Sequence, residues 1–157
     1  MESSLIDPDD LFRAVTKSGA RALIIGRQAL ILLGAPVITG DFDFWLHRDD
    51  IAPFNAALEP LGYTANRSPE DARQWGRYKL EDGDQVDVLV ARGVSTVDGV
   101  MVHFDDVWSR RQTLWSDTYV SVEAPSIVDL IATKRFAARP KDAEDIRYLT
   151  VLLSKQR

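Results

Sequence analysis

The segment Asp-Phe-Asp-Phe-Trp-Leu, which begins at Asp41, constrains the fold more than any other part of the chain because its polar and apolar side chains alternate. In an extended strand, successive side chains point to opposite faces of a sheet. Phe42, Phe44 and Leu46 therefore share one face, whereas Asp41 and Asp43 share the other. The alternation predicts a strand with one face in a core and two carboxylates on the opposite face.

A second strand, predicted over residues 85–90, repeats this arrangement. Its three valines share one face, and Asp87 lies on the opposite face. Residues 78–80 are expected to pair with it in a hairpin that turns at residues 81–84. Aspartate is disfavoured inside strands, so Asp87 indicates either a functional carboxylate or an exposed strand face.

The remaining elements define the fold class. Helices are expected from Pro8 to a stop at Gly19, over residues 27–33, 51–61 and 105–111, from Pro125 and from about Lys141, and strands over residues 22–25 and 119–122. A strand also fits residues 27–33, and residues 67–74 fit an exposed loop or a short irregular helix. This order predicts an α/β or α+β domain, with a mixed sheet flanked by helices and further helices in the C-terminal part.

Residue composition excludes several kinds of site. The 157 residues, of which 45% are hydrophobic, are enough for the core of one domain, expected over residues 1–157. The absence of cysteine excludes disulfides, thiolate zinc sites and cysteine nucleophiles. The two histidines, His47 and His103, are too few for a histidine-rich metal site.

The net charge limits the kinds of partner. A charge of −5 has the wrong sign for a non-specific nucleic-acid binder, although a local basic patch is compatible with it. Arg73, Arg77, Lys79 and Arg92 could form a basic rim near Asp87, or they could simply face solvent.

The N-terminal residues and the apolar stretches predict a cytoplasmic protein. Residues 1–10 contain neither a basic lead nor an apolar run, so no signal peptide is expected. Apolar stretches such as residues 29–33 are far too short to span a membrane. We therefore expect no membrane contact.

Three carboxylates would converge if the strands that carry Asp43 and Asp87 were neighbours with matched faces. Like charges at close range repel and raise one another's pKa, so a cation is the natural partner of such a cluster. Magnesium favours oxygen ligands, and two or three carboxylates with substrate phosphates are enough to hold it. Alternatively, the pair Asp41 and Asp43 is merely solvated, as aspartates at strand edges often are.

Two parts of the chain resemble a known family. The motifs Ile-Ile-Gly ending at Gly26, Thr-Gly-Asp-Phe-Asp-Phe beginning at Thr39, and Val-Asp-Val-Leu around Asp87 resemble the polymerase-β-type nucleotidyltransferase core. The segment from Ser126 through Arg-Pro-Lys-Asp to Ile146 resembles the C-terminal part of a bacterial branch that holds the abortive-infection toxin nucleotidyltransferases. The resemblance covers about residues 22–152, and it implies a core at about 20–123 with a C-terminal helical part at about 124–157.

The resemblance implies metal-dependent transfer of a nucleoside monophosphate from a nucleoside triphosphate to a hydroxyl on RNA, protein or a small molecule. Asp41 and Asp43 would bind Mg2+ (or Mn2+), and Asp87 would complete the metal site and help to deprotonate the acceptor. Gly26 would let backbone amides approach the triphosphate, and Lys134 would bind phosphate oxygens. The branch further implies a toxin-type component, which could act with a protein partner in a toxin–antitoxin pair.

Arg27 departs from the family, which has a small residue at this position. An arginine can hold phosphate through paired hydrogen bonds, or it can fill the pocket. The second outcome predicts a catalytically inactive relative that binds a nucleotide or a protein, although an enzyme is favoured. Lys134 could likewise bind phosphate or pair with Asp142, and Trp45 could pack in the core or stack on a base.

Overall fold

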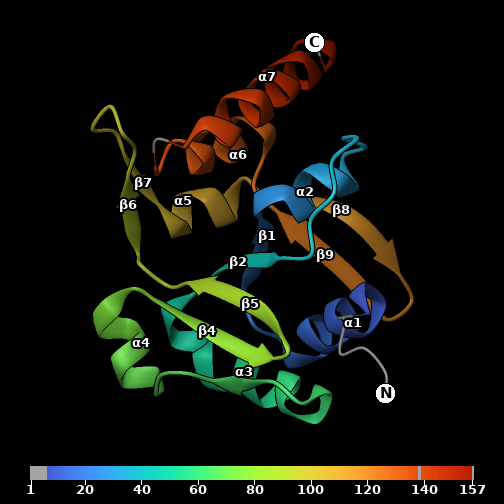
Figure 1. The fold of residues 1–157 in the computed structure, drawn as a ribbon, viewed down its shortest axis with the longest axis vertical. Coiled ribbons are helices and arrows are strands. Elements are labelled where there is room, and N and C mark those ends of the chain that lie inside the picture. The colour runs from blue at the N-terminus through green and yellow to red at the C-terminus, as the bar shows by residue number, and fades with distance from the viewer. Residues whose placement is uncertain (1–6, 138, 157) are drawn as a thin grey trace.

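A five-stranded mixed sheet forms the centre of the molecule, seen in a computed structural model that describes residues 7–137 and 139–156 (Figure 1). Its strands lie in the order β1 (Ala22–Ile25), β2 (Phe42–Leu46), β5 (Asp84–Leu89), β4 (Arg77–Asp82) and β3 (Thr64–Ala65). β2 and β5 run parallel, whereas the other neighbouring strands run antiparallel. The mixed α/β fold predicted from the sequence is confirmed.

Helices surround this sheet. Those in the described residues are α1 (Pro8–Ser18), α2 (Gly26–Leu32), α3 (Ile51–Leu58), α4 (Pro69–Trp75), α5 (Phe104–Ser109), α6 (Ile127–Lys134) and α7 (Pro140–Lys155). In Figure 1, α6 and α7 stack at the top, and α1, α3 and α4 lie at the bottom. Within residues 7–137 and 139–156, no helix is both long and apolar enough to cross a membrane.

Short polar segments start and stop these helices as the sequence predicts. The carboxylate of Asp7 accepts a hydrogen bond from the backbone amide of Asp9 at 3.0 Å, directly before Pro8. Gly19 ends α1 in the left-handed conformation, with φ of 71°. Ser126 caps α6 in the same way as Asp7 caps α1.

The two faces of the sheet pack into two hydrophobic cores. The three alternating apolar residues of β2 are buried in the larger core. Trp45 belongs to the smaller core on the opposite face, where its ring is fully buried and meets Phe104 edge to face. Its indole Nε1 donates to the backbone carbonyl of Ala91 at 2.9 Å. Trp45 is therefore a core residue rather than a surface for a base.

The hairpin and the segment before it are more regular than predicted. β4 and β5 extend into the expected four-residue turn, so that Gly83 alone separates them, with φ of 75°. Residues 69–75 form a regular helix, α4, because the hydroxyl of Ser68 accepts from the backbone amide of Asp71 at 3.2 Å. The predicted helix over residues 51–61 divides into α3 and a 3-10 turn at Glu59–Leu61.

Two ribbons complete the described part of the chain. β6 (Gly93–Ser95) pairs with β7 (Met101–His103), and β8 (Gln112–Asp117) pairs with β9 (Val120–Ala124). β9 corresponds to the strand expected at residues 119–122, whereas β8 was not predicted. The register of β8 shifts between Thr113 and Trp115. Such an irregularity interrupts the alternation by which a strand is recognised in a sequence.

Candidate active site

Two of the three predicted carboxylates lie side by side in the sheet. Asp43 of β2 stands opposite Asp87 of β5 in the strand register, so both side chains project from one face. Asp41 directly precedes β2 and is exposed, and its backbone amide donates to Thr39 Oγ1 at 3.1 Å. The two strands are thus neighbours with matched faces, and they bring Asp43 and Asp87 together.

A cavity of about 520 Å3 opens over this carboxylate pair. Its lining includes Gly26, Asp43, Asp87 and Lys134, and excludes Asp41 and Arg27. The rest of the lining comes from β1, β2, β5, β4, the loop after β3, the end of α6, and the segment between α6 and α7. The structure therefore brings four of the six predicted site residues around one space.

The surroundings of Asp43 raise its pKa to about 6. Burial is the largest cause, followed by the nearby carboxylates of Asp87 and Asp41. Lys134 and Arg139 act in the opposite direction and lower the pKa of Asp43. Asp43 is thus a partly buried acid between like charges on one side and two cations on the other.

Gln85 holds the second carboxylate in place. Its side-chain amide Nε2 donates to both carboxylate oxygens of Asp87, at 2.9 and 3.1 Å. Because the two residues are two apart on β5, their side chains lie on the same face. Gln85 was not predicted as a site residue, although its spacing of two residues from Asp87 on the same strand is a signal that could have identified it.

The cation at the edge of the cavity belongs to a buried ion-pair network. Lys134 Nζ lies 3.0 Å from Asp145 Oδ2, and the relative exposures of these side chains are 4% and 1%. Arg27 reaches the same carboxylate, with its Nε and Nη2 each 3.3 Å from an oxygen of Asp145. Arg27 therefore does not fill the cavity, because its guanidinium is directed at α7.

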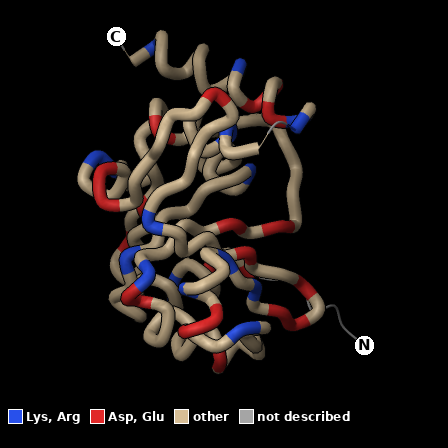
Figure 2. Tube along the Cα trace, turned by 90° about the vertical axis from the view of Figure 1, so that its left-hand side faces the viewer, with Lys and Arg blue, Asp and Glu red and all other residues tan. Residues whose placement is uncertain are grey.

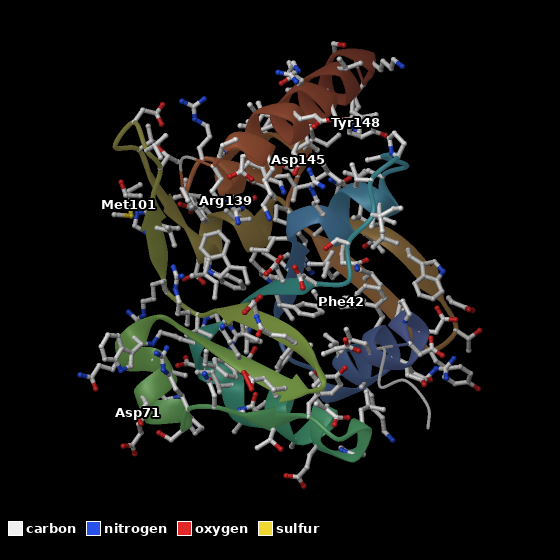
Figure 3. All side chains as sticks on the ribbon, in the orientation of Figure 1. Phe42, Asp71, Met101, Arg139, Asp145 and Tyr148 are labelled. Atoms are coloured by element: carbon white, nitrogen blue, oxygen red, sulfur yellow. The ribbon has the colours of Figure 1, made fainter. Side chains whose placement is uncertain are left out.

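Asp142 has a different partner from the one predicted. Arg139 Nε and Nη2 donate to the carboxylate of Asp142 at 2.9 and 3.1 Å, whereas Lys134 pairs with Asp145. The alternative of a Lys134–Asp142 salt bridge is wrong, because the carboxylate that reaches Lys134 lies three residues further along α7. Figure 3 shows Arg139 and Asp145 in this helical part, above Phe42 of the sheet.

Gly26 lets α2 begin directly beside Asp43. Its φ is +71°, and a Cβ atom added there would lie 2.5 Å from Asp43 Oδ2. Both the backbone conformation and the contact exclude a side chain, since only glycine adopts this region without strain. Close approach of the backbone to the carboxylate is therefore built into the turn between β1 and α2.

We expect Gly26→Ala to lower the free energy of unfolding by about 1–2 kcal/mol, through left-handed strain and displacement of Asp43. Urea denaturation followed by tryptophan fluorescence measures this change. Gly40→Ala is the matched control, because Gly40 has no positive φ and no atom within 4 Å of an added Cβ. Equal stability of the two variants would contradict the assigned constraint at Gly26.

The oxygen donors at the cavity suit a magnesium or manganese ion. Asp43 and Asp87 offer two carboxylates on one face, and Asp41 is near enough to raise the pKa of Asp43. Magnesium keeps several waters and takes one or two carboxylates plus substrate phosphates, so this donor set fits it. Across the described residues, no three histidine, aspartate or glutamate side chains are arranged to hold a metal by themselves.

Comparison with known proteins identifies the fold. No family model and no curated protein matches the sequence. The solution structure of the antibiotic-resistance factor ANT(2'')-Ia is similar over 93% of this chain and 82% of that one, with a TM-score of 0.65 and 14% identity. A complex of ANT(2'')-Ia with adenylyl-2''-tobramycin gives a TM-score of 0.62 at 14% identity, over 93% of this chain and 87% of that one.

A third similar structure comes from Thermotoga maritima. It is TM1012, described as a candidate nucleotidyltransferase, with a TM-score of 0.61 and 14% identity over 96% of this chain and 91% of that one. The chain therefore has the fold of nucleotidyltransferases along nearly its whole length. At this identity the likeness establishes the fold and leaves the activity to the residues of the site.

Proposed function

We propose that the chain is a nucleotidyltransferase, which moves a nucleoside monophosphate from a nucleoside triphosphate to an acceptor hydroxyl. The observation that carries the proposal is the alignment of Asp43 and Asp87 on adjacent parallel strands, at a cavity that Gly26 and Lys134 also line. Paired carboxylates beside a glycine turn and a cation suit the binding of a metal–triphosphate complex.

The reaction joins the acceptor oxygen to the α-phosphorus and breaks the bond from that phosphorus to the bridging oxygen, which leaves with pyrophosphate. Asp87 takes the proton of the acceptor hydroxyl, and Gln85 orients its carboxylate. Lys134, which lines the same cavity as Asp43, would contact the phosphates. Asp41, Asp43 and Asp87 would hold Mg2+ or Mn2+, which supplies positive charge to the reacting phosphate groups.

Arg27 has a supporting role in this proposal. Its ion pair with Asp145 leaves the cavity open, which favours an active enzyme over the inactive nucleotide- or protein-binding relative. Arg27 does not line the cavity, whereas Lys134 and Gly26 do, so the triphosphate contacts are assigned to Lys134 and to backbone amides near Gly26. A toxin-type role with a protein partner belongs to the same proposal, and only the resemblance of residues 126–146 supports it.

Calorimetric titration tests the proposal. Each nucleoside triphosphate is titrated with Mg2+ or Mn2+ into the wild type, Asp43→Ala and Asp105→Ala, the last being a control whose carboxylate is 87% exposed. We expect metal-dependent binding to the wild type and to the Asp105 variant, and none to the Asp43 variant. Absence of triphosphate binding to the wild type would favour the inactive protein-binding relative instead.

A further inference from the structure

A second group of cations lines the cavity on the β4 side of Asp87, opposite to the side on which Asp43 lies. The register places Asp87 of β5 between Asp43 and Lys79 of β4, so these three side chains form a row across one face. Arg77 lies two residues before Lys79 on the same strand and therefore on the same face. Arg67, from the loop after β3, also lines the cavity.

The two cationic groups come from opposite parts of the molecule. Lys134 and Arg139 belong to α6 and to the residue before α7, which lie above the sheet, whereas β4 and α4 lie below β2 (Figure 1). Figure 2 likewise shows Lys and Arg positions both beside α7 and in the lower part of the chain. The cavity therefore has cations at two sides, with Asp43 and Asp87 between them.

An exposed aromatic ring continues the second group at the surface. Trp75, the last residue of α4, has a relative exposure of 66%. The guanidinium of Arg67 lies 5.2 Å from the centre of its ring, and Arg67 Nη1 donates to the backbone carbonyl of Arg77 at 2.6 Å. This arrangement fixes Arg67 and Trp75 beside each other, next to the exposed side chains of Arg77 and Lys79.

From this arrangement we infer that the acceptor is the unpaired end of a nucleic-acid strand, held by the surface of Arg67, Trp75, Arg77 and Lys79, termed here the β4 basic surface. The inference rests on the proposed function, in which Gly26 and Lys134 take the triphosphate. The second cationic group is then left for the acceptor, and it selects an anion and repels a polycation. A solvated tryptophan beside cations is the combination by which single strands are bound through bases and phosphates.

The chemistry of this acceptor agrees with the row of side chains. The terminal hydroxyl of the strand attacks the α-phosphorus, its proton passes to Asp87, and pyrophosphate leaves. The strand becomes one nucleotide longer. Lys79, which is the neighbour of Asp87 in the register, would then contact a phosphate close to the reacting end.

Fluorescence anisotropy with a short, labelled single-stranded RNA tests the β4 basic surface. Arg77→Ala/Lys79→Ala is expected to weaken binding about tenfold and to reduce the slope of log K against log salt by about 1.4, since each phosphate contact on a single strand contributes about 0.7. Trp75→Ala is expected to weaken binding about tenfold at any salt concentration. Arg13→Ala/Lys17→Ala changes the charge equally at exposed positions of α1 and should leave binding unchanged.

Two outcomes would overturn the inference. They are equal loss of binding in the two double variants and absence of RNA binding by the wild type. If RNA fails to bind while triphosphates bind in calorimetry, the acceptor assignment falls and the proposed function stands. If the Arg77/Lys79 variant alone loses RNA but no triphosphate binds the wild type, the surface stands and the proposed function falls.

Discussion

Asp145→Ala is expected to lower the free energy of unfolding by about 3–5 kcal/mol, because it removes the shared partner of two cations. Lys134 is 4% exposed and its ammonium contacts Asp145, so the variant leaves a charge buried without that partner. Arg27 loses the same carboxylate. Urea denaturation followed by tryptophan fluorescence measures the loss, which is a large part of the 5–15 kcal/mol typical of a domain.

Asp142→Ala is the matched control for this prediction. Asp142 and Asp145 are both buried acids on α7, with relative exposures of 3% and 1%. The partner of Asp142 is Arg139, whose side chain is 53% exposed and can return to water. We therefore expect a loss of about 1 kcal/mol, which is typical of pairs with an exposed member.

A second control separates charge from packing. In Lys134→Met/Asp145→Leu, both members of the buried pair become apolar, so neither is left as an isolated charge. We expect this variant to recover the part of the lost stability that is due to Lys134, as replaced buried pairs often do, whereas Arg27 still lacks Asp145. If Asp145→Ala and Asp142→Ala lose the same stability, the buried network is not the source of the effect.

Asp43→Asn is expected to stabilise the fold by about 2 kcal/mol at pH 7.5 while removing metal-dependent triphosphate binding. The pKa of Asp43 in the folded protein is about 6, above its ordinary value of 3.8, so the folded state resists ionisation of this acid. This difference between the two pKa values corresponds to a loss of at most about 3 kcal/mol in the free energy of unfolding. Partial exposure of the side chain to solvent makes the loss smaller. Burial of the charge is the largest cause of this raised pKa, and repulsion by Asp87 and Asp41 adds to it.

The pH dependence gives the sign of this effect. Between pH 3.8 and about 6 the folded state binds more protons at Asp43 than the unfolded state does, so stability falls as pH rises through this window. The destabilisation by the ionised Asp43 is complete above pH 6 and disappears toward pH 4. We therefore expect the wild type and Asp43→Asn to differ at pH 7.5 and to converge at pH 4.5, as measured by urea denaturation at both values.

Addition of Mg2+ with a triphosphate provides the control for Asp43→Asn. Under the proposed function, the bound complex stabilises the wild type alone. It therefore reduces the difference in the free energy of unfolding between the wild type and Asp43→Asn at pH 7.5. A variant that is less stable than the wild type at pH 7.5 would show that Asp43 contributes favourably, and would contradict the assigned repulsion.

Period-two patterns explain why much of the site could be predicted from the sequence. Phe42, Phe44 and Leu46 alternate with Asp43, and this alone fixes which side chains enter the larger core. Asp87 alternates with valines in the same way, so the strand predicted over residues 85–90 also predicted that Asp87 lies on the face opposite the valines. The parallel pairing of the two strands was not predicted, because nothing in either pattern specifies a neighbour.

Partners of charged side chains could not be predicted in this way. Arg27, Lys134 and Asp145 belong to three helices, and their meeting depends on how α2, α6 and α7 pack. The sequence shows the charges but not the rotation of each helix, so Asp142 and Asp145 were equally suitable partners for Lys134. β8 was not predicted because its register shift between Thr113 and Trp115 interrupts the alternation of polar and apolar side chains.

The sharing of one carboxylate by Arg27 and Lys134 restricts how this chain can exchange segments with its relatives. A chimaera that takes its last helix from another protein brings in a foreign residue at position 145, while the two cations stay behind on α2 and α6. Recombination between residues 134 and 145 would therefore separate groups that are tolerable only together. The three positions should be inherited as a unit, and grafting experiments should transplant them as one.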